Sequence, residues 1–136
     1  MITVHIPYEA PSQNVTDRMH WRVLHRKKQE WTNAIRWMLG VQCGIAGPLN
    51  PEKKKMAVTI LSYRTRRIAD HANLVGGCKL VVDAIRDAGL IFDDSDQYAC
   101  IAYTQQLASQ SPYPYLKKPS TIITVEDFTT IHRDNK

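Results

Sequence analysis

The order of hydrophobic and polar positions along the chain predicts four β-strands. The first, ITVHI at 2–6, alternates in character and ends at Pro7, where a turn-rich loop begins. The other segments of strand character are 56–63, a stretch within 97–106, and 121–128. Gly, Pro and Lys or Ser accumulate around 44–55 and 109–119, and both segments are therefore predicted to be irregular connections.

Two longer segments show helical periodicity instead. Over roughly 17–39 large apolar residues recur at helical spacing, and Gly40 is the predicted end of this helix. The apolar residues are Trp21, Leu24, Trp31, Ile35 and Met38. We expect the aromatic rings among them to belong to the core rather than to a surface that stacks on bases.

The second predicted helix lies within 73–88. Asn73 is suited to cap its start through a side-chain oxygen, and Gly89 is suited to end it. Its apolar stripe consists of Leu74, Cys78, Val81, Val82, Ile85 and Ala88. The polar residues on the opposite face are Lys79, Asp83 and Arg86.

This succession of elements predicts an α+β fold, in which a small mixed β-sheet packs with two main helices. With 136 residues the chain is long enough for one domain with a hydrophobic core, so we expect 1–136 to form a single domain. Residues 128–136 are expected to form a flexible tail. A fold of this kind hosts many functions and decides none of them.

Composition narrows the class of protein. Hydrophobic content is 43% and charged content 23%, as in ordinary globular proteins, and no apolar run approaches the length of a membrane span. The start of the chain lacks the features of a signal peptide. Three cysteines without a CxxC pair favour neither a zinc site nor a disulfide framework. These features predict a cytoplasmic protein that does not contact membranes, and the family resemblance described below implies the cytoplasm of a bacterium or a phage-infected host.

Charge is distributed unevenly along a chain whose net charge is +5. Twelve Lys or Arg but only two acids lie between Arg18 and Arg67, whereas six aspartates and two basic residues lie between Asp70 and Asp96. A basic half next to an acidic segment suggests a surface that binds a polyanion beside a centre that binds a cation. Many small basic proteins do not bind DNA, so a protein-interaction domain remains an alternative.

The acidic stretch IFDDSDQ, residues 91–97, places Asp93 and Asp94 side by side. Their mutual repulsion requires either hydration, as in a turn after a helix, or neutralisation by a metal ion. Phosphodiester hydrolysis with Mg²⁺ requires carboxylate ligands and a cation near the phosphate, and Asp70, Asp94 and Lys79 are of the required types. Gly76–Gly77 would let a phosphate approach backbone N–H groups. Each feature alone has an ordinary structural explanation.

Taken together, these residues resemble the RusA-type Holliday junction resolvases, small endodeoxyribonucleases of phages and prophages. The family pattern combines an Asp-x-Asp-Asn element, a Lys, a helical Asp-Ala-Leu-like segment, a Gly-hydrophobic turn and an Asp-Asp pair. The matching residues here are Asp70, Asn73, Lys79, Asp83-Ala84-Ile85, Gly89-Leu90-Ile91 and Asp93-Asp94. The opening strand and a Pro-Ser-x-Asn loop also match through Pro11, Ser12 and Asn14. The resemblance extends over about residues 1–127.

The resemblance implies a Mg²⁺-dependent endonuclease, with Mn²⁺ as a substitute metal, that acts as a homodimer. Its substrate would be a four-way junction or other branched DNA, resolved by paired symmetric nicks during recombination and repair. Asp70 and Asp94 would hold the metal that activates water, Lys79 would assist at the phosphate, and Asp93 would be a ligand or an acceptor beside it. Asp83 would position Lys79.

The chain departs from the family pattern in two respects. The spacing from Asn73 to Lys79, which includes Gly76–Gly77, is longer than in the compact members of the family, and one position differs in residue type. Ala72 replaces the second aspartate of Asp-x-Asp-Asn, and His71 lies beside it. His71, Asp93 or Asp83 would have to compensate for the missing carboxylate. The alternative function is therefore a junction-binding protein whose nuclease activity is weak or lost.

Helix geometry raises a further question about the site. An unbroken helix over 73–88 would span about 24 Å, whereas the chain from Gly89 to Asp94 reaches back at most roughly 17–20 Å. Either the helix is shorter, or a second subunit supplies one carboxylate. The basic residues predicted to bind DNA are Arg64, Arg66, Arg67, Arg18, Arg22, Arg26 and Lys27.

Overall fold

A four-stranded mixed sheet forms the centre of the computed structural model, which describes residues 1–45, 51–112 and 117–129. The strands are β1 (Ile2–Ile6), β2 (Met56–Arg64), β3 (Ala99–Leu107) and β4 (Ser120–Asp127). Their spatial order is β1-β4-β2-β3, with β2 parallel to β3 and the other neighbours antiparallel. The predicted α+β fold with a small mixed sheet is confirmed.

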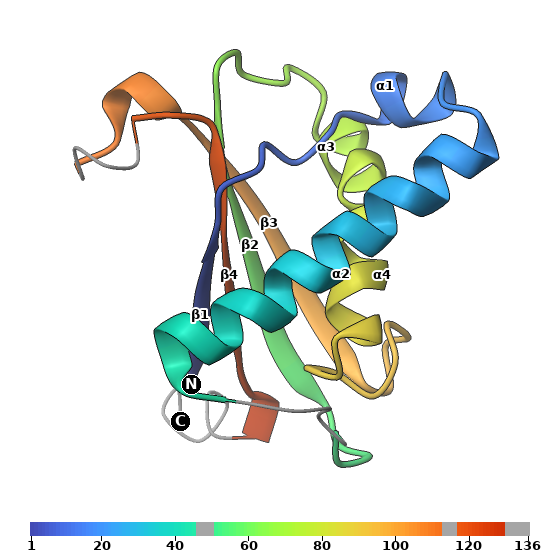
Figure 1. Ribbon diagram of the computed structural model, residues 1–136, viewed down its shortest axis with the longest axis vertical. Helices are drawn as coiled ribbons and strands as arrows, with labels where there is room; N and C mark the ends of the chain where they lie inside the picture. The colour runs from blue at the N-terminus through green and yellow to red at the C-terminus, as the bar shows by residue number, and fades with distance from the viewer. Residues whose placement is uncertain (46–50, 113–116, 130–136) are drawn as a thin grey trace.

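Five helical segments accompany the sheet in the described residues. They are α1 (Gln13–Asp17), α2 (Trp21–Cys43), α3 (His71–Gly77), α4 (Lys79–Asp87) and the short 3-10 helix η1 (Ala108–Gln110). The long helix α2 and the shorter helix α4 lie across one face of the sheet and contact each other (Figure 1). None of the helices in this described part combines the length and the apolar character that a membrane span requires.

The core lies between the sheet and these two helices. Strand register brings Val4, Ile123 and Ile60 into one row across β1, β4 and β2, and all three side chains are fully buried. Ile35 of α2 and Ile85 of α4 are equally buried and belong to the same cluster. The alternation that predicted the strands therefore separates a core face from a more polar outer face.

The first predicted helix differs from the structure at both ends. His20 caps α2 by accepting a hydrogen bond from the N–H of Arg22 at Nδ1 (3.2 Å), so the helix is separated from α1. At the other end α2 continues through Gly40 and ends at Gly44, whose φ of 68° lies in the left-handed region. Gly40 was the wrong stop because a glycine inside a helix is tolerated when packing supports both sides.

The second predicted helix is divided at Cys78 into α3 and α4. Gly89 follows its end with φ 87°, as predicted, and donates its N–H to the Arg86 carbonyl (2.9 Å). Together the two helices form the crossover that the parallel pair β2–β3 requires. The start of α3 therefore lies near the end of β2, whereas the segment after α4 lies near the start of β3, at the opposite end of the sheet (Figure 1).

The predicted tail and parts of two predicted loops lie outside the described residues. Of the tail, 128 and 129 continue directly from β4 in a helical turn, and 130–136 are not described. The loops lack 46–50 and 113–116.

Candidate nucleic-acid interface

The two sequence motifs of the resemblance meet where the loop before α1 packs against α3. Gly77 permits this contact, because a Cβ there would lie 2.7 Å from Ser12 Cα and closer still to the Pro11 carbonyl oxygen. The Gly-Gly pair lies at the end of α3, where this loop covers it. At Gly77 the requirement for glycine is thus explained by close packing of the backbone, without the predicted approach of a phosphate.

Asn73 joins the same two segments. Its Oδ1 accepts a hydrogen bond from the backbone N–H of Asn14 at 3.1 Å, across 59 positions of sequence. The prediction that Asn73 caps the helix is therefore wrong. That role belongs to Asp70, whose Oδ1 accepts from the N–H of Ala72 at 3.0 Å while its own backbone is extended.

Asp70 is exposed, as are its neighbours His71 and Ala72. No Lys, Arg or His in the described part of the chain lies within ion-pair distance of the Asp70 carboxylate. The Asp70 side chain is thus open to solvent apart from its hydrogen bond to Ala72. Ala72 brings only a methyl group to the position where the family has a further carboxylate.

Lys79 and Asp83 line a hollow of about 470 Å³ between the helices. Asp17 of α1, Lys28 of α2 and Gly76 of α3 line it as well. Together with α4, four helices therefore contribute to this hollow. Two lysines and two aspartates line this hollow, so it is polar but nearly balanced in charge. Lys79 is exposed to solvent, and the ion-pair partner of Asp83 is Arg86 rather than Lys79, so the role predicted for Asp83 in positioning Lys79 stays a prediction.

The acidic turn after α4 carries its own cation. Arg86 lies 3.8 Å from Asp94 Oδ1, 3.8 Å from Asp83 Oδ1 and 3.5 Å from Asp87 Oδ1. The pKa of Asp93 is lowered, first by a hydrogen bond from the Asp94 backbone N–H, then by its interaction with the Asp94 side chain, with smaller contributions from the Ser95 hydroxyl and the Arg86 charge. Internal hydrogen bonds and one arginine thus offset the repulsion in this turn.

Asp70 and Asp94 do not meet within one chain. Asp70 begins α3 and Asp94 follows α4, and the seventeen helical positions from 71 to 87 span about 25 Å, so the two carboxylates lie at opposite ends of the crossover. Within the described ranges, no group of three or more His, Cys, Asp or Glu side chains is placed to hold a metal ion. The predicted Mg²⁺ ligands therefore do not fit a metal site inside a single protomer.

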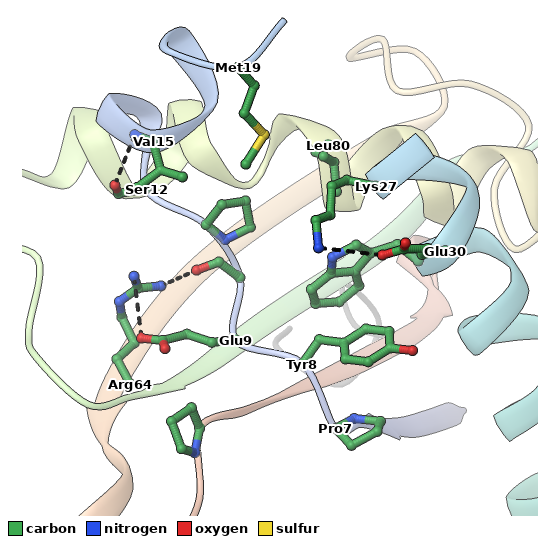
Figure 2. A pocket seen from close by; sticks show the side chains of 14 residues that line it. Pro7, Tyr8, Glu9, Ser12, Val15, Met19, Lys27, Glu30, Arg64 and Leu80 are labelled. Carbon is green, nitrogen blue, oxygen red and sulfur yellow. Dashed lines mark hydrogen bonds and ion pairs between the residues drawn. The ribbon is translucent and has the colours of Figure 1, made fainter. Parts of the chain in front are cut away.

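Arg64 is an internal residue and not part of the predicted DNA-binding surface. It is 7% exposed, and Figure 2 shows its guanidinium turned toward Glu9 and the backbone carbonyl of Ala10. It lines a cleft of about 590 Å³ that is also bordered by Tyr8 and by an ion pair between Lys27 and Glu30 (3.5 Å). Both basic residues of this cleft face acidic partners.

The other basic residues predicted to bind DNA are exposed. They are Arg66 and Arg67 between β2 and α3, Arg18 directly after α1, and Arg22, Arg26 and Lys27 in the first turns of α2. Within the described residues, Lys27 is the one among them that forms an ion pair, with Glu30. These segments gather with α1 and the start of α3 at one end of the molecule (Figure 1). We name this the basic end. Asp70 lies there, whereas Asp93 and Asp94 do not.

Sequence reasoning missed one residue of the basic end. Trp21, assigned to the core, is 66% exposed, whereas Trp31 on the same predicted stripe is 4% exposed. The signal that could have revealed it is the composition of 18–29, which contains basic residues but no acid. No protein-family model, curated protein or solved structure matches the chain.

Proposed function

We propose that this chain is a structure-selective endodeoxyribonuclease of the RusA type, which binds four-way or branched DNA at its basic end. The observation that carries the proposal is the hydrogen bond between Asn14 and Asn73. It joins the Pro-Ser-x-Asn loop to the helix that Asp70 caps, so that two motifs far apart in sequence form one structural unit. A chance likeness in two separate segments would not require them to meet.

Charge at the basic end supports DNA as the ligand. Arg66 and Arg67 precede Asp70 on the same exposed segment, and the arginines at the start of α2 extend the surface. Phosphate groups bind such a surface with release of counterions, which makes the affinity depend on salt. Asp70 would then lie among phosphates, where a carboxylate can support hydrolysis only if it holds a metal cation beside it.

Assembly of the site requires a second copy of the chain. In an antiparallel homodimer about a two-fold axis, the basic end of each protomer lies beside the acidic turn of its partner. Asp70 of one protomer and Asp94 of the other then form two equivalent sites, which suits a junction that is cut symmetrically. Mg²⁺ or Mn²⁺ is the proposed cofactor of these composite sites.

A second candidate, a junction-binding protein without cleavage, is favoured by the ion pair between Arg86 and Asp94. An arginine that already pairs with Asp94 competes with any metal ion at that carboxylate. Ala72 removes a further carboxylate from the opposite end.

Binding to a synthetic four-way junction and to linear duplex DNA of equal length tests the proposal. We expect the junction to bind more tightly, and contact with about six phosphates would give a log–log salt slope near −5. Equal affinity for both DNAs, or a slope near zero, would contradict it. Sedimentation at micromolar concentration should give a dimer. Nicking that requires Mg²⁺ or Mn²⁺ separates the nuclease from the binding protein.

A further inference from the structure

The side chain of Trp21 is a large apolar surface at the start of α2 that the fold leaves in solvent. The centroid of its ring lies 5.6 Å from the centroid of the His20 ring. The Arg22 Cζ atom lies 5.3 Å from the centroid of the Trp21 ring. Both neighbours are themselves exposed, so these contacts do not bury the ring. Trp21 is therefore held at the surface by short-range contacts alone.

The surroundings of Trp21 are positively charged. Residues 18–29 contain five Lys or Arg, two His and no Asp or Glu. Arg18, Arg22 and Arg26 from this run are exposed, and none of them forms an ion pair with a carboxylate of the described residues. An indole ring in contact with one unpaired arginine, on a segment that exposes two more, is suited to a ligand that has both flat aromatic surfaces and negative charge.

Trp37 shows that exposure alone does not make such a surface. It is 70% exposed on the same helix, sixteen positions after Trp21, which places it about 24 Å further along the axis and roughly on the opposite side. Its neighbour Arg36 donates a hydrogen bond to the Asp87 carbonyl (2.8 Å). Arg36 is the one charged residue in 31–45, whereas five Lys or Arg lie in 18–29. The two tryptophans thus share their exposure and their helix but differ in the number of basic residues around them.

We propose that Trp21 stacks on an unpaired base of DNA while Arg18, Arg22 and Arg26 bind the adjacent phosphates. Base–aromatic stacking contributes substantially to single-strand binding and is tolerant of sequence. Duplex DNA keeps its bases paired and stacked, so it offers phosphates but no exposed base face to the ring. The preferred ligand class is therefore single-stranded DNA, including unpaired nucleotides at a branch point.

This inference deepens the proposed function, because it names the feature of branched DNA that the basic end would recognise. The start of α2 lies at the same end of the molecule as α3, which Asp70 caps (Figure 1). A base held on Trp21 would thus lie at the same end as the strand proposed for cleavage. The inference is tested with linear DNA, independently of junction binding or cleavage.

The experiment compares wild type, Trp21→Ala and Trp37→Ala in binding a labelled single strand of about 15 nucleotides and its duplex, by fluorescence anisotropy at fixed salt. We expect Trp21→Ala to weaken single-strand binding about tenfold and to leave duplex binding within about twofold of wild type. Trp37→Ala should change neither. Trp21→Phe, which keeps an aromatic ring, should restore most of the lost affinity.

Three results would overturn the inference. The first is that Trp21→Ala weakens binding to the single strand and to the duplex equally. The second is that Trp21→Ala and Trp37→Ala have equal effects. The third is that the wild type does not bind the single strand, which would favour a protein partner for Trp21. Because Trp21 is exposed, its loss should not unfold the chain, and far-UV circular dichroism checks this. Single-strand binding that depends on Trp21, without preference for the junction, would refute only the proposed function. Junction preference without Trp21-dependent single-strand binding would refute only the role of Trp21.

Discussion

The two ends of the α3–α4 crossover use aspartate in different ways. At the basic end Asp70 caps α3 with one carboxylate oxygen and has no cationic partner within the described residues, although exposed arginines occupy the neighbouring segments. At the other end the aspartates of the acidic turn and of α4 surround Arg86. At the acidic end one arginine offsets only part of the negative charge. At the basic end the exposed arginines have no carboxylate partner within the described residues, so this is the end available to a polyanion.

This contrast depends on how each end is built. The basic end is assembled from segments far apart in sequence, so it requires the packing of the loop before α1 on α3. The acidic turn is held by contacts within about ten residues and by the helix that precedes it. Substitutions should therefore disrupt the basic end cooperatively and the acidic end locally.

The largest effect is expected from Gly77→Ala. The new methyl group would overlap the Pro11 carbonyl and the Ser12 backbone, so the loop would have to move, at a cost of about 3 kcal/mol in the free energy of unfolding. Urea denaturation measures this cost. Because the loop is one wall of the basic end, junction affinity should fall as well.

Gly76→Ala is the matched control for this substitution. A Cβ at Gly76 would meet only the side chain of Gln13, which is flexible and can turn away. We expect a change of less than about 1 kcal/mol, since alanine also favours the helix. Equal destabilisation by both substitutions would show that the loop does not pack on α3 as described.

Cys78, at the joint between the two helices, tests whether the crossover keeps its ends apart. Its thiol is buried, and burial raises its pKa to about 11, whereas Cys43 and Cys100 are exposed. With Ellman's reagent at pH 8, we expect two thiols to react rapidly and Cys78 at least about tenfold more slowly. Because the folded pKa is raised, the stabilising contribution of the neutral thiol is present below about pH 8.5 and is lost as pH rises through about 11.

Rapid reaction of all three thiols would contradict this picture. It would mean that the joint between α3 and α4 opens easily, so that Asp70 and Asp94 of one chain could approach each other. A Cys78→Ala variant identifies the slow thiol, because only the slow phase should disappear.

A smaller effect is expected from Arg86→Gln at the acidic end. Removal of this partly exposed ion-pair partner should lower the free energy of unfolding by less than about 1 kcal/mol. The pKa of Asp93 should rise toward its ordinary value but not reach it, because hydrogen bonds within the turn are the main cause of its lowering. Carbonyl-detected NMR titration measures this pKa, and an unchanged value would show that Arg86 does not act on the turn.

The pH dependence of the turn follows from the same lowering. Since the folded pKa of Asp93 lies below the unfolded value, its stabilising contribution is present above about pH 4 and is lost as pH falls through the folded pKa. Amide exchange of the turn should therefore accelerate at acid pH before that of the core. Uniform acceleration throughout the chain would contradict this local linkage.

Much of the fold follows from local patterns in the sequence. The four strands and the apolar stripe from Leu74 to Ala88 are determined by alternation and helical spacing, and the structure buries them as predicted. The position of Arg64 could not be predicted in this way. Its partner Ala10 lies 54 positions away, and only the packed loop turns a basic residue at the end of a strand into an internal one.

The candidate site was predicted in part, for a similar reason. Residue types and spacing identified Asp70, Lys79, Asp83 and Asp94, but the spacing alone could not show which of them face one another. Helical periodicity placed Trp21 in the core because it continues the stripe of Trp31. However, α2 begins at Trp21, where the ring contacts only the exposed side chains of His20 and Arg22 and remains 66% exposed. Periodicity gives the face of a helix, not the extent of the surface that covers it.

Complementation between two inactive variants tests most directly whether the two ends form one site across a dimer. Asp70→Asn and Asp94→Asn are each assayed for nicking of a four-way junction in Mg²⁺, and then after mixing and subunit exchange. Asn also caps helices well, so the first substitution should leave α3 intact. In a mixed dimer one composite site keeps both carboxylates and the other loses both. We predict that each variant alone is inactive and that the mixture nicks one strand, whereas an inactive mixture beside an active wild type would contradict the shared site.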